Sequence, residues 1–344
     1  MQTLITQLFN IDYPIICSGM TGVSRPELVA AVSNAGGLGI LATADLNPDQ
    51  TRQAIHEIRA LTNKPFGANI PFIIPGAKLN AKVLVEEKVK VVNYTLGSGQ
   101  ELIEAVHEYD GKAVATVTNL THAFSAQRRG ADALIVTGHE AAAHGGEVSS
   151  LVLVPSIVDA IKIPVIAAGG FADGRGLVAA LAIGAEGIAM GTRFMNTVES
   201  PVHDIMKNLS IKAQVYDTIY SDRIDGLPCR AMKSKGTDRM IRQRFYLFRA
   251  LLNSRQAAKT FGFPWHKLVL AIMLSGVKKS KQLARMANAF TAFQLSMEQG
   301  NLEKGVFLMG QVTGIIKDTP TVSEVMKKII LQAKTQKKLI SSKL

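Results

Sequence analysis

The chain has 344 residues, of which 47% are hydrophobic, and a formal net charge of +12 at pH 7. This apolar content is enough for a large buried core and excludes a disordered chain. Its cysteines, Cys17 and Cys229, are too few for a disulfide framework, which is typical of a reducing compartment.

Targeting signals are not expected in this sequence. Its first twenty residues lack a basic segment followed by an apolar one, which argues against a signal peptide. The longest apolar run, residues 268–277, is about half the ~20 residues that a membrane span requires. We therefore expect a cytoplasmic protein without a transmembrane segment.

From Tyr13 to Phe194, short apolar runs alternate with longer stretches of helical character. Each run is continuously apolar, as in strands that are buried on both faces of a parallel sheet. The runs lie at residues 13–17, 38–42, 66–70, 89–94, 112–117, 131–137, 163–169 and 186–191. Eight strand–helix units predict a (β/α)8 barrel, with a doubly wound sheet as the alternative.

Helix-entry signals lie between several of these runs and near the end of the chain. Short polar side chains can accept hydrogen bonds from the first free N–H groups of a helix. The expected N-terminal signals are Ser24 with Glu27, Asn47 with Pro48, Asp173, and Thr321 with Glu324. The last ten residues are predicted to fray.

After Phe194 the alternation stops, and the chain becomes helical in character and basic. We expect residues 1–200 and 305–335 to form the barrel, and residues 201–304 to form a smaller, mainly helical domain that serves as a substrate domain or lid. Between Leu227 and Met297 there are 14 Lys and Arg residues against one acid, Asp238. This segment predicts either a surface that meets an anionic partner or a solvated helical face.

Small, glycine-rich segments follow the last two predicted strands. In a (β/α)8 barrel, the loops after strands seven and eight commonly bind phosphate through backbone N–H groups. Gly169-Gly170 and Gly191-Thr192 are placed for this role. Residues 174–179 match a dinucleotide fingerprint, but their first glycine does not directly follow the strand, and no acid ends a following strand as that motif requires.

Residues 138–147 read GHEAAAHGGE and follow the sixth predicted strand. Their small side chains leave space for a flat ligand, and a histidine, with an ordinary pKa of ~6.5, can exchange a proton near neutral pH. His139 and His144 are also of metal-ligand type. However, this spacing presents both rings to a metal only on a helix, and the glycines favour a loop. We predict proton transfer here, and no metal site.

Several segments together resemble the nitronate monooxygenase family, formerly the 2-nitropropane dioxygenases. Its relatives include flavin-dependent enoyl-ACP reductase II and NADH:quinone reductases. The block at 163–194 is the most specific match, and residues 205–300 match loosely. The matching segments are YPIICSGM (13–20), AAVSNAGGLGILA (30–42), KPFGANI (64–70), GHEAAAHGGE (138–147), residues 163–194 and GQVTGII (310–316).

The resemblance implies a (β/α)8 barrel that holds FMN, closed over by a smaller helical domain. His144 corresponds to the family's active-site histidine. Ala142-Ala143 replaces the family's Gly-Gly before this histidine, so the loop is stiffer and its space smaller. The residues implied to contact FMN are Gly19, Met20, Thr21, Asn69, Thr137, Ala142, Gly169, Gly170, Phe171, Gly191 and Thr192.

The family predicts oxidation of alkyl nitronates with O2. The alternative is NAD(P)H-dependent reduction, through FMN, of a quinone or of an enoyl-ACP or enoyl-CoA thioester. In that case the basic segment, residues 230–285, would meet an anionic carrier such as acyl carrier protein or CoA. Both activities require a small-molecule substrate. The intact His144 disfavours a barrel without turnover, and the sequence contains no recognised nucleic-acid-binding motif. It does not determine the oligomeric state.

Overall fold

The computed structural model describes residues 1–74, 76–142, 144–243, 250, 255, 258, 265–266 and 276–343. Most of the apolar run at 268–277, and much of the basic segment 230–285, lies outside these residues. Within the part described, no helix is long and apolar enough to cross a membrane.

Eight parallel strands form a closed barrel, so the prediction of a (β/α)8 fold is confirmed. The barrel closes where β1 pairs with β8, with Ile16 opposite Ala189. The strands are β1 (Ile15–Cys17), β2 (Leu38–Ala42), β3 (Gly67–Pro71), β4 (Val91–Thr95), β5 (Lys112–Val117), β6 (Ala133–Thr137), β7 (Val165–Ala168) and β8 (Gly187–Met190).

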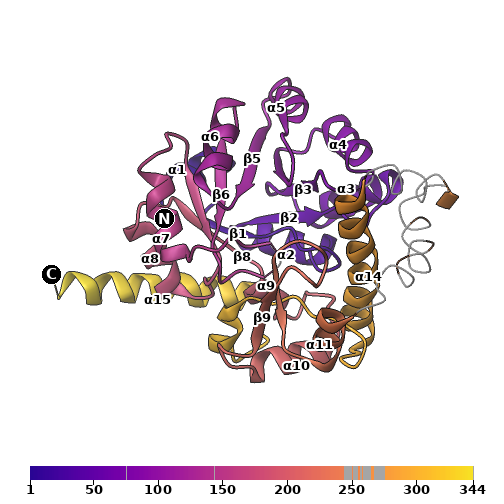
Figure 1. The fold of residues 1–344 in the computed structure, drawn as a ribbon. Helices are drawn as coiled ribbons and strands as arrows, with labels where there is room; N and C mark the ends of the chain where they lie inside the picture. The colour runs from indigo at the N-terminus through magenta and orange to yellow at the C-terminus, as the bar shows by residue number, and fades with distance from the viewer. Residues whose placement is uncertain are drawn as a thin grey trace.

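Helices follow the strands and cover the outside of the barrel (Figure 1). They are α2 (Pro26–Asn34), α3 (Pro48–Leu61), α4 (Ala77–Glu86), α5 (Gln100–His107), α6 (Leu120–Arg128), α7 (Ser150–Val158), α8 (Gly174–Ala182) and the short α9 (Thr192–Met195). Asn47 and Asp173 accept backbone N–H groups at the starts of α3 and α8, as predicted. The prediction for Ser24 is wrong: α2 begins after Arg25, and the Ser24 hydroxyl instead donates to the Ser18 carbonyl oxygen.

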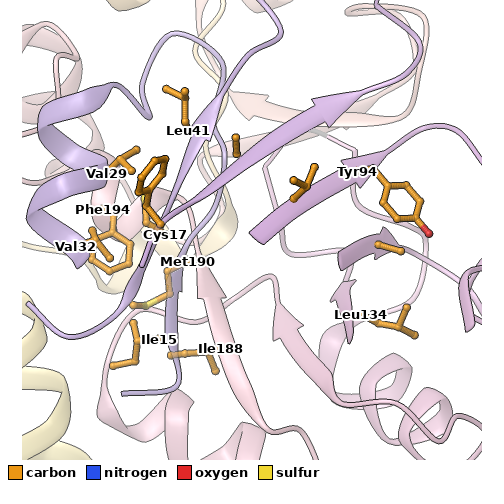
Figure 2. Close-up of a cluster of buried hydrophobic side chains, with 14 of the residues drawn as sticks. Ile15, Cys17, Val29, Val32, Leu41, Tyr94, Leu134, Ile188, Met190 and Phe194 are labelled. Carbon is orange, nitrogen blue, oxygen red and sulfur yellow. The ribbon is translucent and has the colours of Figure 1, made fainter. Parts of the chain in front are cut away.

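The barrel separates two apolar clusters because successive strand residues point to opposite faces. One cluster fills the interior, where Ile16 and Ile40 pack, and it extends to Ile5 and Phe9 of α1 (Leu4–Phe9). The other lies between strands and helices, where Val29 of α2 and other side chains meet the outward-facing residues of the strands (Figure 2). The buried interior leaves the strand ends as the place for a site.

The chain between β8 and the C-terminal helix adds elements outside the barrel: α10 (Asp204–Lys212), β9 (Thr218–Ser221), β10 (Cys229–Met232), α11 (Lys235–Arg242) and α14 (Val277–Gln299). In Figure 1, α10, α11 and β9 gather on one side of the barrel, and α14 rises from there along it. The antiparallel β9–β10 hairpin was not predicted in this segment.

The chain then returns to the barrel through η1 (Gln311–Ile315) and α15 (Val322–Ser341). Thr321 and Glu324 form the predicted capping box. A side chain at Gly174 of α8 would lie 2.4 Å from the backbone nitrogen of Ala333, so this glycine allows α15 to pack tightly on α8. The prediction of a fraying tail is wrong, because α15 continues to Ser341 and extends away from the barrel (Figure 1).

Candidate functional site

A cavity of ≈ 1790 Å³ lies at the carboxyl ends of the barrel strands. Residues from the ends of the strands form its floor, and α14 contributes an apolar wall. The wall residues of α14 are Leu283, Met286, Ala287, Phe290, Phe293 and Met297. His144 and all eleven residues predicted to contact FMN line this cavity: Gly19, Met20, Thr21, Asn69, Thr137, Ala142, Gly169, Gly170, Phe171, Gly191 and Thr192.

The loops after β7 and β8 form a cradle that consists mostly of glycine. Gly169 and Gly170 have positive φ angles of +95° and +84°, a conformation that glycine adopts readily. The nearest protein atom to a side chain at Gly170 would be 3.5 Å away, on Glu140, so the protein leaves room for a ligand group there. The Thr192 hydroxyl accepts a hydrogen bond from the Gly310 N–H at 3.0 Å, which ties this cradle to the segment before η1.

A chain of buried amides lies on the opposite side of the cavity. The Asn69 side-chain amide donates to Asn93 Oδ1 at 2.7 Å, and the Asn93 amide donates to Thr116 Oγ1 at 2.9 Å. A side chain at Gly19 would lie only 2.6 Å from Asn69 Cβ. This close approach keeps the floor flat between β1 and β3. A planar ring system with a phosphate at one end therefore fits the floor and the glycine cradle, as FMN requires.

The loop that carries His144 is held by the β9–β10 hairpin. The Tyr220 hydroxyl donates to the Gly145 carbonyl oxygen at 2.8 Å. The Arg230 guanidinium donates to the His139 carbonyl oxygen from Nε at 3.2 Å and from Nη2 at 3.0 Å. Arg230 also lies over the Tyr220 ring, with Cζ 5.4 Å from its centroid. Burial lowers the pKa of Arg230, yet an arginine keeps its charge at neutral pH.

His144 faces the connection between β9 and β10. Its Nε2 lies 3.4 Å from Asp225 Oδ2, and its Nδ1 lies 3.4 Å from the Pro228 carbonyl oxygen. The His144 side chain is 31% exposed, whereas the Asp225 side chain is 6% exposed. A histidine at the edge of a cavity, beside a buried carboxylate, can hold and transfer a proton.

Glu140 has a structural role at the start of α7. Its carboxylate accepts the Ser150 N–H at 2.9 Å and the Ser150 hydroxyl at 3.0 Å. A carboxylate suits a helix N-terminus because it satisfies free N–H groups and complements the helix dipole. Within the part of the chain that the structure describes, no group of three or more His, Cys, Asp or Glu residues could hold a metal ion.

The sequence did not indicate the partners that hold His144. Tyr220, Asp225 and Arg230 all come from residues 218–232, where only a helical pattern was expected. The turn-forming DGLP at 225–228 between two short runs was the available signal. Arg230, counted above as part of a basic surface, is 3% exposed and belongs to the site. His122, an exposed residue of α6, also lines the cavity.

Comparisons with known proteins find similarity over most of the chain. The nitronate monooxygenase family model matches residues 2–81 and 74–332. A probable nitronate monooxygenase from Staphylococcus saprophyticus is 33% identical over 289 residues, which cover 70% of this chain and 81% of that protein.

Two further relatives match over nearly the whole chain. A (3aS,4S,5R,7aS)-5-hydroxy-7a-methyl-1-oxo-octahydro-1H-indene-4-carboxyl-CoA dehydrogenase from Rhodococcus jostii is 37% identical over 340 residues, covering 97% of this chain and 96% of that protein. The structure of FabK from Thermotoga maritima superposes with a TM-score of 0.85 at 34% identity, covering 100% of both chains. With its closed barrel, glycine cradle and cavity histidine, this chain belongs to the nitronate monooxygenase family of flavin-dependent oxidoreductases.

Proposed function

We propose that this protein is an FMN-dependent oxidoreductase that acts on a thioester with a bulky apolar acyl group, such as an acyl-CoA. In this proposal, residues 201–304 serve as the substrate domain, and His144 holds the proton that the reaction transfers. The observation that carries the proposal is the cavity, which combines the cradle at the barrel mouth with the apolar wall of α14.

The size of the cavity supports a large substrate. Pockets for single small ligands usually measure ~300–1,000 Å³, whereas this cavity measures ≈ 1790 Å³. FMN and an alkyl nitronate of a few atoms would leave much of it unfilled. The loop after β3 also lines the cavity, with Phe72, Ile73 and Ile74. A bulky apolar group against these residues would be stabilised by removal of its surface from water.

The full-length relatives support the same substrate class. The Rhodococcus jostii protein is named for a bicyclic carboxyl-CoA substrate, and its similarity extends over 97% of this chain. The probable nitronate monooxygenase matches 70% of this chain. A match over 97% of the chain includes α14, which forms the apolar wall.

Different residues would bind different parts of FMN and of the substrate. Gly169, Gly170, Gly191 and Thr192 would hold the phosphate end of FMN, and Asn69 would lie beside its ring system. FMN, when bound, would supply the transfer of two electrons to or from the substrate. His144 would give a proton to the substrate or take one from it, and the α14 wall would exclude water from the reacting atoms.

The electron donor and the anionic carrier are further parts of the proposal. NADH or NADPH would reduce FMN in the reductive direction. The exposed side chains of Arg239 and Arg242 on α11 would attract the phosphates of CoA or the acidic surface of a carrier protein.

Oxidation of an alkyl nitronate with O2 is the second candidate function. The family model and the Staphylococcus saprophyticus relative favour it. The same cradle and the same histidine would serve this reaction. The two candidate functions differ in whether the substrate fills the space beside the α14 wall.

An anaerobic titration of the FMN-loaded protein, followed by the visible flavin absorbance, tests both candidates. We expect NADH or NADPH to bleach the flavin and a cyclic α,β-unsaturated acyl-CoA to restore its absorbance. Bleaching by propane-2-nitronate alone, with no response to any thioester, would favour nitronate oxidation. A protein that binds no FMN would contradict both functions.

Ala287→Phe gives a sharper test of the apolar wall, because the larger side chain would fill part of the cavity beside α14. We expect KM for the cyclic acyl-CoA to rise at least ~10-fold, with little change in the response to propane-2-nitronate. Equal effects on both substrates would contradict the proposed place of the acyl group.

A further inference from the structure

Asp225 is a buried carboxylate that the proposed reaction does not yet use. It lies in the connection between β9 and β10, and the whole residue is 4% exposed. A buried carboxylate destabilises a protein unless charge or hydrogen bonding compensates for its lost hydration. One of its oxygens, Oδ2, lies 3.4 Å from Nε2 of His144, and both residues line the cavity.

The connection holds this carboxylate in a fixed place. Asp225 Oδ1 accepts the Leu227 N–H at 3.0 Å. The preceding Ile224 is 1% exposed and packs in an apolar cluster outside the barrel. Gly226 has a φ of +91°, and a side chain there would lie 3.0 Å from Gln282 of α14. The position of Asp225 is therefore set by its turn, by the apolar cluster around Ile224 and by α14, and does not depend on His144.

The neighbouring thiol of Cys229 does not compensate the charge. Burial raises the pKa of this thiol, and the negative charge of Asp225 raises it further. The thiol therefore remains neutral over the physiological range. It can donate a weak hydrogen bond, but it brings no positive charge to the carboxylate.

The second nitrogen of His144 faces the same connection. Nδ1 lies 3.4 Å from the Pro228 carbonyl oxygen. Both ring nitrogens thus face acceptors that come from residues 225–228. A distance of 3.4 Å is longer than the ~2.7–3.2 Å of a formed hydrogen bond, and such contacts often shorten when a substrate binds.

We propose that Asp225 is the positioning residue for His144: its carboxylate accepts the N–H of Nε2 and so leaves Nδ1, whose contact with the Pro228 carbonyl oxygen is long, to exchange the proton with the substrate. This inference rests on the proposed proton-transfer role of His144. Asp225 lies on the β9–β10 hairpin, so a residue outside the barrel would orient a histidine at the mouth of the barrel.

The test uses the FMN-loaded protein with Asp225→Asn, His144→Ala and both together. Asparagine keeps its one side-chain oxygen for the Leu227 N–H and therefore places its NH2 group, a donor without charge, opposite the ring. We expect Asp225→Asn to lower kcat by ~10–100-fold with little change in KM, which is part of what a general acid or base contributes. Asp222→Asn, a substitution of an exposed residue in the same connection, is the matched control and should leave kcat unchanged.

The double variant separates positioning from a general structural effect. If Asp225 acts through His144, adding Asp225→Asn to His144→Ala should change kcat less than twofold. An equal loss of kcat in both backgrounds, or no loss in the wild-type background, would overturn the proposal.

A second readout does not depend on turnover. In protein with ¹⁵N-labelled histidine, His144→Ala identifies the ring signals of His144 by their disappearance. We expect Asp225→Asn to shift these signals and leave those of the other histidines in place, even if no substrate is ever found. Unmoved His144 signals would contradict the contact, whereas shifted signals without turnover would count against the proposed function alone.

Discussion

The Tyr220 hydroxyl donates a hydrogen bond of 2.8 Å to the carbonyl oxygen of Gly145, a residue 75 positions earlier in the chain. Gly145 directly follows His144, so this bond fixes the loop beside the proposed proton carrier. Burial and the charge of Glu147 raise the pKa of Tyr220, which keeps its hydroxyl protonated as a donor at neutral pH. The same ring packs against His139, with the two rings tilted by 59° and their centroids 4.5 Å apart.

Tyr220→Phe removes the hydroxyl and retains the ring. We expect the free energy of unfolding to fall by ~1 kcal/mol, as for one hydrogen bond, and kcat to fall several-fold because the His144 loop is less constrained. Urea unfolding and steady-state kinetics measure the two effects. Tyr216→Phe is the control, because Tyr216 is 80% exposed; equal effects at both tyrosines would refute the anchoring role.

His144→Ala should separate chemistry from cofactor binding. The imidazole faces Asp225 and Pro228 rather than the glycine cradle, so we expect the purified variant to retain FMN. Turnover should fall by ~10²–10⁴-fold, the usual contribution of a general acid or base. The flavin absorbance and kcat/KM report the two properties.

His122→Ala is the matched control for this change. His122 also lines the cavity, but it lies exposed near the start of α6. We expect its removal to leave kcat near the wild-type value. Unchanged kcat/KM in His144→Ala would exclude His144 from the mechanism.

Much of the barrel and its mouth could be predicted from the sequence, because both depend on short segments. Continuous apolar runs identify strands that are buried on both faces. Gly169-Gly170 directly follows a strand end, where such barrels commonly bind phosphate. Asp225 and Tyr220 could not be placed in this way, since their role depends on packing between the hairpin and a loop that lies far away in the sequence.

The number of charged residues in a segment also does not show which of them lie at the surface. Arg230 adds to the basic total of its segment, yet its side chain is buried and donates to a backbone carbonyl. Composition records the charge but not the direction of the side chain. Ser24 shows the same limit, because its hydroxyl satisfies the Ser18 carbonyl in the β1 loop instead of capping α2.

Gly170→Ala tests the cradle against a matched glycine. Gly170 and Gly130 have φ angles of +84° and +91°, and side chains there would have nearest neighbours at 3.5 and 3.6 Å. Both alanines should therefore cost a similar ~1–2 kcal/mol of stability, from backbone strain. Only Gly170 lines the cavity, so we expect Gly170→Ala alone to raise the Kd of FMN by at least ~10-fold. Equal FMN affinity in both variants would argue against a phosphate at this loop.

Asp318 should make stability depend on acidic pH. Burial raises the pKa of this carboxyl, but hydrogen bonds from Arg193 and Lys328 outweigh it and leave the pKa below its ordinary value. A lowered pKa contributes stability that is complete above the unfolded pKa, ~3.9, and is lost as pH falls through the folded pKa. Urea unfolding of wild type and Asp318→Asn should differ most at neutral pH and converge as the pH falls below the ordinary pKa range of an aspartate. A constant difference would contradict this role.

The Arg193–Asp318 contact also stabilises the loop that carries the proposed cofactor site. The Arg193 side chain is 7% exposed, and Nη1 donates to Asp318 Oδ1 at 2.6 Å. Arg193 directly follows Thr192, so losing this contact would loosen the loop after β8. We expect Asp318→Asn to release FMN more readily at neutral pH, measured by filtration of the free flavin.

Reversing Arg239 and Arg242 to glutamate tests the basic surface. Arg249, a further arginine of the basic segment, lies outside the described residues. Both α11 side chains are exposed, so an attraction to CoA phosphates would act through solvent and be screened by salt over ~10 Å at 0.1 M. We expect KM for an acyl-CoA to rise several-fold at low ionic strength and to approach the wild-type value at 0.5 M salt, where screening is stronger. The response to uncharged quinones should not change.

Lys334→Glu with Lys337→Glu is the matched control for this reversal. It changes the net charge equally, but on α15, where both lysines are exposed. If KM rises as much in this control, the effect belongs to the net charge of the protein and not to α11. If neither pair changes KM at any ionic strength, α11 is a solvated helical face, and the CoA phosphates bind elsewhere.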